Sequence, residues 1–134
     1  MCSPPPFPLL ACRLCTSLRM RGAYVYCAYN SGHVRIFDLL SCTQVVQIAA
    51  SSRWLNAIEV HPNGETFACV SEDTTLCVWR FLDGRPEERK VLHTGSVTVA
   101  DAMLCGVAFN GGLDRSHVCV AAYDQPAIQA WKID

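Results

Sequence analysis

The sequence is poor in charge and lacks any long apolar run. Only 17% of its 134 residues are Asp, Glu, Lys or Arg, and the formal net charge is −1. This balance excludes the basic electrostatic field by which proteins bind nucleic acid or anionic lipid, so we predict no nucleic-acid partner. No apolar stretch approaches the roughly 20 residues needed to cross a bilayer, so we also predict no membrane insertion.

Patterns that carry chemistry are scarce as well. No glycine-rich phosphate loop joins a strand to a helix, which leaves nucleotide binding without support. No second carboxylate, histidine or nucleophile is patterned with Asp73, the most distinctive acidic residue. We therefore predict no catalytic residue and no cofactor, and we expect that the protein is not an enzyme.

Three copies of one phrase dominate what is present. Thr66–Leu82 reads as two short β-compatible stretches around an acidic turn, and similar phrases occupy Tyr24–Phe37 and Val118–Trp131. The aromatic residues that close the three phrases are Phe37, Trp79 and Trp131, spaced 42 and 52 residues apart. A period of roughly 40–45 residues with one hairpin per unit is typical of four-stranded propeller blades. A helical solenoid is disfavoured because the apolar runs are short, β-branched and frequently interrupted.

The predicted fold class is all-β, a partial β-propeller of about three four-stranded blades. A Pro-rich N-terminal segment covers residues 1–14, and the blades cover about 15–50, 51–93 and 94–134. The outer strand of the second blade is predicted at 89–93. The sequence stops before an outer strand of the last blade, so that blade is expected to lack one.

Cysteine is abundant, with nine residues, but the pattern does not predict a disulfide scaffold. The count is odd and the N-terminus lacks the apolar core of a secretory signal. Cys27, Cys69 and Cys119 stand at similar places in the three phrases, so we predict reduced, buried and inert thiols. The one metal-like spacing joins Cys12 to Cys15, and no second close Cys or His pair follows, so we predict no metal site.

These phrases resemble the WD-repeat β-propeller family. Ile48–Gly64 is similar to that family's approach to an inner strand, and Ser71–Arg80 is similar to its acidic turn and closing Trp-Asp. The phrases that resemble the C-terminal part of one member are Val99–Asp101, Leu104–Gly106, Tyr123–Asp124 and the closing Trp131. The resemblance implies a non-catalytic, cytoplasmic scaffold or adaptor that binds proteins.

The resemblance also implies a set of structural residues. In a typical WD repeat, a histidine before the inner strand joins a network with the turn aspartate, a strand hydroxyl and the closing tryptophan. Here Ala50–Ser51 replaces the Gly-His dipeptide in the second repeat, so we expect only a partial network. The residues assigned to structural roles are Phe37, Asp73, Trp79, His93 and Trp131, with His93 in the histidine role of the third repeat.

Residues that the blade pattern does not require are the candidates for binding. In a propeller, the loop before each inner strand and the turn of the central hairpin open on one face. The protein-binding residues predicted there are Tyr29, Arg53, Trp54, Glu72 and Tyr123, with Asn30, Ser96 and Gln125 beside them. Trp, Tyr and Arg are the residue types that most often anchor protein interfaces. For Trp54, capping of the blade is an equal alternative.

Three blades do not close a ring. Closed propellers typically use 4–8 blades, and a repeat array without caps exposes its terminal apolar faces. We therefore expect the C-terminal part of a larger propeller. The alternative is an oligomerisation or ring-completing subunit, for example a homo-oligomer in which two arcs pair.

Overall fold

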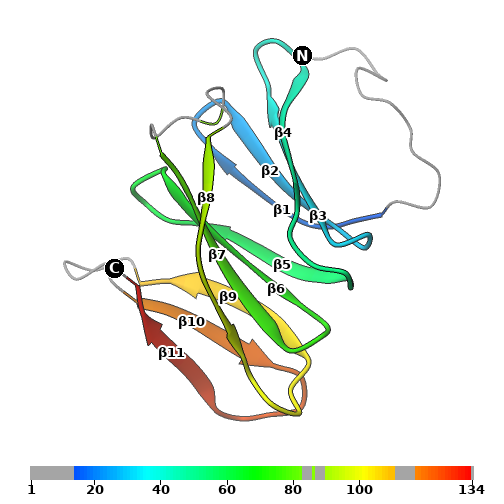
Figure 1. Ribbon diagram of the computed structural model, residues 1–134, viewed down its shortest axis with the longest axis vertical. Coiled ribbons are helices and arrows are strands. Elements are labelled where there is room, and N and C mark those ends of the chain that lie inside the picture. The colour runs from blue at the N-terminus through cyan, green and yellow to red at the C-terminus, as the bar shows by residue number, and fades with distance from the viewer. Residues whose placement is uncertain (1–13, 83–85, 87–89, 111–116, 134) are drawn as a thin grey trace.

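The computed structural model describes residues 14–82, 86, 90–110 and 117–133, which form three antiparallel β-sheets packed side by side (Figure 1). The first sheet consists of β1 (Cys15–Arg21), β2 (Tyr24–Tyr29), β3 (His33–Asp38) and β4 (Thr43–Ala49), in that order. The second consists of β5 (Leu55–Val60), β6 (Thr66–Ser71), β7 (Thr75–Phe81) and β8 (Val91–Thr98). The third consists of β9 (Leu104–Phe109), β10 (His117–Ala122) and β11 (Ile128–Lys132).

Each sheet is one propeller blade, numbered one to three along the chain. The innermost strands β1, β5 and β9 pack next to one another, so the blades follow in chain order with the β5–β8 sheet in the middle (Figure 1). Blades one and two have four strands, and blade three has three strands within the described residues. The predicted all-β partial propeller, with a last blade that lacks its outer strand, is confirmed.

The outer strand of blade two differs from the prediction. The predicted segment ended at residue 93 and its first residue, 89, lies outside the described residues, whereas β8 runs from Val91 to Thr98. The Thr94-Gly95-Ser96 sequence looks like a turn, but Gly95 pairs with Val78 of β7 next to a register shift. Pairing with β7 therefore overrides the local preference of this stretch.

Strand β6 is the centre of the molecule because both of its faces are buried. Phe67 and Cys69 belong to a core between blades one and two, and Ala68 and Val70 belong to a second core between blades two and three. All six residues of β6 are buried. Successive side chains of a strand point to opposite faces, so this one strand contributes to both interfaces.

The two interfaces differ in the size of their side chains. The first contains an aromatic cluster in which the Phe67 ring lies 5.5 Å from Tyr26 and 5.7 Å from Phe81, centroid to centroid. The second is filled by smaller aliphatic residues, such as Leu104 and Val118. Aromatic pairs at these distances add about 0.5–1.5 kcal/mol beyond the area that they bury.

The central hairpin turns of blades one and two, β2–β3 and β6–β7, are hydrogen-bonded to the connection that follows each blade. In blade one, the Gly32 carbonyl accepts the amide hydrogens of Ala50 and Ser51, each at 3.0 Å. In blade two, the Thr74 carbonyl accepts the amide hydrogen of Val99 at 2.9 Å. Gly32 and Thr74 both stand five residues before the closing aromatic residue, and both have positive φ, +84° and +75°.

These equivalent positions provide a test of the turn geometry. A Cβ atom at Gly32 would lie 1.9 Å from the Ser51 carbonyl oxygen, so we expect Gly32→Ala to lower the free energy of unfolding by at least about 2 kcal/mol. Thr74→Gly should change it by less than about 1 kcal/mol, because relief of backbone strain offsets the added entropy of the unfolded chain. Urea unfolding followed by tryptophan fluorescence measures both. A Gly32→Ala variant as stable as the wild type would contradict the geometry.

Candidate protein-binding face

The face formed by the central hairpin turns (β2–β3, β6–β7 and β10–β11) and by the connections between blades, here called the loop face, carries a repeated backbone hydrogen bond. In each blade, the residue before the innermost strand accepts an amide hydrogen from the residue just after the second strand. The three pairs, acceptor first, are Leu14 with Asn30 at 2.9 Å, Trp54 with Glu72 at 2.9 Å and Met103 with Tyr123 at 2.8 Å. This bond fixes the backbone at one equivalent point in every blade.

Large apolar side chains are exposed at these fixed points. Leu14 is 62% exposed, Trp54 49% and Met103 44%, and Tyr123 across the bond from Met103 is 67% exposed. The backbone around each of them is held, so displaying these side chains to a partner costs little ordering entropy. The loop face therefore presents one row of apolar anchors on a rigid support.

The predicted residues Arg53 and Glu72 form an ion pair on this face. The Arg53 Nε lies 2.9 Å from a Glu72 carboxylate oxygen, and the Arg53 side chain is 62% exposed. An exposed pair of this kind adds about 0–1 kcal/mol to stability, which leaves both groups available to a partner. The pair lies beside Trp54 and holds the connection between β4 and β5 next to the turn between β6 and β7.

Tyr29 does not project from the loop face as the sequence suggested. Its half-buried ring lies under the Arg35 guanidinium, whose carbon is 4.8 Å from the ring centroid. Burial raises the pKa of the Tyr29 hydroxyl. Ser96 also lies elsewhere, in the middle of β8 opposite Cys77. Arg53, Trp54, Glu72 and Tyr123 thus lie on the loop face, as do Asn30 and Gln125, which were predicted beside them.

Asp73 lies in the turn between β6 and β7, as predicted, and joins it to the preceding connection. Its carboxylate accepts hydrogen bonds from the Ser71 hydroxyl and, at 3.3 Å, from the Ser51 hydroxyl. Ser51 occupies the position at which a typical WD repeat has a histidine. In this chain the serine hydroxyl therefore makes the hydrogen bond to the turn aspartate. Although desolvation raises the pKa of Asp73, the hydrogen bonds from Ser71, Thr75 and Ser51 outweigh it and hold the pKa below its usual value.

The remaining structural residues are distributed among the blades. Phe37 is buried in blade one, and Trp79 pairs with His93 across β7 and β8, their rings 4.7 Å apart. His93 therefore lies in the outer strand of blade two and does not precede the innermost strand of blade three. The Trp79 indole nitrogen is buried without a hydrogen-bond partner among the described residues, so the network in blade two does not reach it.

Sequence reasoning missed Leu14 and Met103. Leu14 falls in the predicted Pro-rich segment of residues 1–14, and Met103 is not among the predicted binding residues. The signal was available in part, because each of them directly precedes an innermost strand, as Trp54 does. What the sequence does not reveal is the backbone hydrogen bond that makes the three positions equivalent.

The cysteines depart from the prediction of buried, reduced thiols. Cys27, Cys69 and Cys77 are free and buried, but Cys15 and Cys105 are free and exposed, and Cys42 is disulfide-bonded. A hydrogen bond from the Cys27 thiol lowers the pKa of Cys15 to about 7. Cys119 is also not equivalent to Cys69. Cys69 pairs with Cys77, two residues before the closing Trp79, whereas Cys119 pairs with Ala130, one residue before the closing Trp131.

Within the described part of the chain, no group of three His, Cys, Asp or Glu side chains is placed to hold a metal ion. Of the segments that the structure describes, none is a helix of sufficient length and apolarity to cross a membrane.

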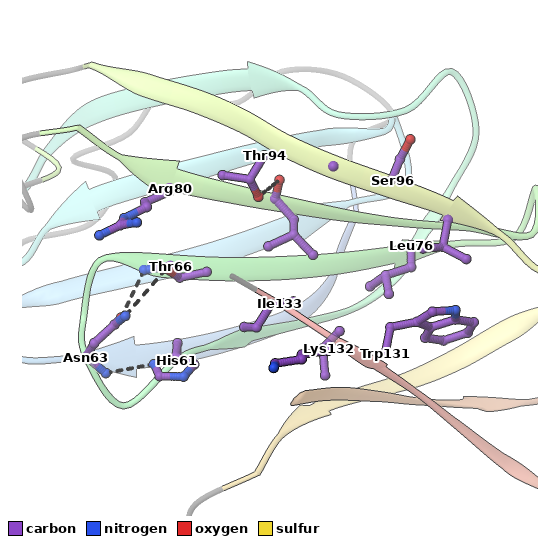
Figure 2. Close-up of a pocket in the computed structure, with 14 residues that line it drawn as sticks. His61, Asn63, Thr66, Leu76, Arg80, Thr94, Ser96, Trp131, Lys132 and Ile133 are labelled. Carbon is purple, nitrogen blue, oxygen red and sulfur yellow. Dashed lines mark hydrogen bonds between the residues drawn. The ribbon is translucent and has the colours of Figure 1, made fainter. Parts of the chain in front are cut away.

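A pocket of about 550 Å³ opens between blades two and three, away from the loop face (Figure 2). One wall comes from β7 and β8, with Thr94 and Ser96 on β8, and the other comes from the end of the chain, with Trp131 and Ile133. Trp131 is half-buried and reaches both the pocket and the second core. The predicted structural tryptophan of blade three thus also lines a cavity.

Comparison with protein families and curated proteins identifies relatives of this chain. The family model described as WDR54 matches residues 6–132. WD repeat-containing protein 54 of Mus musculus is 30% identical over 112 residues, which is 82% of this chain and 33% of the relative. The Homo sapiens protein of that name is 27% identical over 117 residues, 86% of this chain and 34% of the relative. The chain thus spans about a third of these relatives, and the predicted WD-repeat resemblance is confirmed.

Solved structures show the same fold. The β-propeller domain of Myceliophteria thermophila Cps50 (Swd1) superposes with a TM-score of 0.74 at 13% identity and covers 90% of this chain and 40% of that one. The computationally designed Ika4 protein gives a TM-score of 0.71 at 18% identity, over 90% of this chain and 66% of that one. At these identities the similarity establishes the propeller architecture alone.

The low pKa of Asp73 predicts how stability depends on pH. The folded-state pKa lies below the unfolded value of about 4, so the carboxylate stabilises the fold above pH 4. That stability is lost as pH falls through the folded pKa. Asp73→Asn should lower the free energy of unfolding by about 1 kcal/mol at pH 7, with a smaller difference at pH 3, measured by urea unfolding. If the wild type and Asp73→Asn differed in stability by the same amount at pH 7 and at pH 3, the ionised Asp73 carboxylate would not be the stabilising group.

Proposed function

This chain belongs to the WDR54 family of WD-repeat proteins, and we propose that it is a non-catalytic module that binds other proteins through its loop face. The observation that carries the proposal is the row of exposed apolar side chains at Leu14, Trp54, Met103 and Tyr123. Their backbone is fixed by equivalent hydrogen bonds, and their side chains belong to neither core, so packing of the blades does not explain them. Exposed aromatic side chains on a rigid support are the usual anchors of protein interfaces.

The charges around these anchors favour one class of partner. Among the described residues at the loop tips, Glu72, Asp73, Asp101 and Asp124 are acidic and Arg53 is basic. A segment that combines apolar side chains with lysine or arginine complements this surface, and charge complementarity also speeds association. The module then acts as a scaffold or adaptor that recognises a basic, apolar protein segment. We place it in the cytoplasm because it belongs to the WD-repeat family, whose resemblance implies an intracellular scaffold.

Single substitutions on the loop face test this function. Peptides selected from a displayed random library against the whole chain supply defined ligands whose dissociation constants are measured by fluorescence anisotropy. Trp54→Ala and Tyr123→Ala should each weaken binding about thirtyfold, the loss expected for an interface anchor of about 2 kcal/mol. Leu40→Ala is the matched control, because Leu40 is 87% exposed in the turn between β3 and β4, away from the loop face. Equal affinity of all variants for every selected peptide would refute the loop face as the binding site.

Assembly into a ring is the second candidate function, and the terminal blade faces favour it. In blade three, Cys119, Ala121 and Ile128 lie opposite the core side, and Ile128 is 71% exposed. In blade one, Leu18 and Met20 are 53% and 61% exposed. Each of these faces is the side of a blade that a neighbouring blade covers elsewhere in the molecule. A second propeller arc would bury both.

Solution mass tests the assembly. We expect light scattering behind gel filtration to show a mass that rises from monomer toward dimer with concentration, because pairing buries the terminal apolar faces. Ile128→Lys should shift this equilibrium toward monomer, and Leu40→Lys, which adds the same charge away from the blade faces, should not. A wild-type chain that stays monomeric at every concentration would exclude self-assembly.

A further inference from the structure

Two cysteines lie side by side in the first strand pair of blade one. Cys15 is the first residue of β1, and Cys27 lies within β2, the neighbouring strand (Figure 1). Cys15 pairs with Tyr29, and the register shifts between Cys15 and Ser17. Because side chains alternate along a strand, Tyr29 and Cys27 point to the same face of the sheet, and Cys15 points there with them. The pairing of β1 with β2 therefore brings the two thiols together.

The two sulfur atoms are in hydrogen-bond contact. The Cys27 thiol donates to the Cys15 sulfur, which lowers the pKa of Cys15 to about 7. The same hydrogen bond, together with burial, raises the pKa of Cys27. At neutral pH, Cys15 is thus a thiolate in a large fraction of molecules, while Cys27 keeps its proton. The thiolate is the nucleophilic form of cysteine, so Cys15 is the member of the pair that reacts first.

A positive charge is buried beside Cys27. Arg35 pairs with Cys27 across β2 and β3, and Arg35 is only 5% exposed. Its Nε donates to Oε1 of Gln47 at 3.0 Å, while its Nη2 is buried without a hydrogen-bond partner among the described residues. The charge of Arg35 favours the ionised form of Cys27. A guanidinium at this place would stabilise the anion that develops when the Cys27 thiol reacts.

The equivalent positions in blades two and three hold a leucine and a small apolar residue. In blade two they are Leu55 and Cys69, which belong to the core between blades one and two. In blade three they are Leu104 and Val120, which belong to the core between blades two and three. Blade packing is therefore satisfied by apolar contacts at these positions. Two adjoining thiols in blade one add a reactivity that packing does not require.

From this geometry we propose that Cys15 and Cys27 form a reversible disulfide in response to hydrogen peroxide. The Cys15 thiolate attacks one oxygen of the peroxide, the O–O bond breaks, hydroxide leaves, and Cys15 becomes a sulfenic acid. The Cys27 sulfur then attacks the Cys15 sulfur, the S–O bond breaks, and the Cys27 proton leaves with the hydroxyl group as water. The two sulfurs lose two electrons in total, and these reduce the peroxide to water and hydroxide. A small dithiol restores both thiols by exchange.

The disulfide would join β1 to β2 next to the loop face. Leu14 precedes Cys15 and exchanges two hydrogen bonds with Asn30. The Asn30 amide donates to the Leu14 carbonyl at 2.9 Å, and the Leu14 amide donates to Oδ1 of Asn30 at 2.9 Å. A covalent bond at the next residue restrains this end of β1. The chemistry of the thiol pair does not depend on the loop face binding anything.

Peptide mapping after peroxide treatment tests the proposal. Trypsin releases Cys15 in the fragment 14–19 and Cys27 in the fragment 22–35, and neither fragment contains another cysteine. We expect a small excess of hydrogen peroxide, added to the whole chain, to join these two fragments, and dithiothreitol to separate them. Dimedone labels sulfenic acids, and it should label Cys15 at least about tenfold more in Cys27→Ser than in the wild type, because the second thiol is gone.

The rate of alkylation tests the contact between the thiols. Cys27→Ala removes the hydrogen-bond donor, so the reaction of Cys15 with iodoacetamide at pH 7 should slow at least about threefold. Cys27→Ser keeps a donor and should slow it less. Cys105→Ser is the matched control, because Cys105 is an exposed free thiol in blade three and its loss should leave the joining of the two fragments unchanged.

Three results would each overturn the proposal. The first is that peroxide does not join the fragments 14–19 and 22–35. The second is that dimedone labels Cys15 equally in the wild type and in Cys27→Ser. The third is that Cys15 is alkylated at the same rate in Cys27→Ala and in the wild type.

Discussion

The burial of β6 on both faces is the constraint on which the rest of the structure depends. Phe67 and Cys69 need blade one to cover them, and Ala68 and Val70 need blade three. Burial of a single large apolar side chain is worth about 1.5–3 kcal/mol, so the middle blade is stable only between two neighbours. The same requirement applies to the outer blades, which have a neighbour on one side each.

The loop face and the pocket both follow from this stacking. Equivalent strands in equivalent register bring the residue before each innermost strand to the same level, which turns Leu14, Trp54 and Met103 into one row on the loop face. At the other side of the molecule, the same stacking opens the pocket between blades two and three.

Much of the fold can be predicted from local sequence patterns. The three phrases, their closing aromatic residues and their turn sequences predicted three blades, and each phrase coincides with the central hairpin of one blade: β2–β3, β6–β7 or β10–β11. The exceptions have a common cause. Residues Thr94–Ser96 have turn-like chemistry, yet they lie inside β8 because they pair with β7, and His93 is carried with them to the ring of Trp79. Propensity is a local quantity, and strand pairing is decided across the sheet.

The sequence by itself determined the blade repeat, the aromatic residues at its end and the candidate anchors Trp54 and Tyr123, because periodicity and residue type are local properties. Only the tertiary structure decided which side chains are free to bind. It packed Tyr29 against Arg35, placed Leu14 and Met103 level with Trp54, and brought Trp131 to a pocket between blades two and three. These outcomes depend on hydrogen bonds and contacts between residues that are about 6 to 50 positions apart in the sequence. No single stretch of the chain shows which of these residues come together when the chain folds.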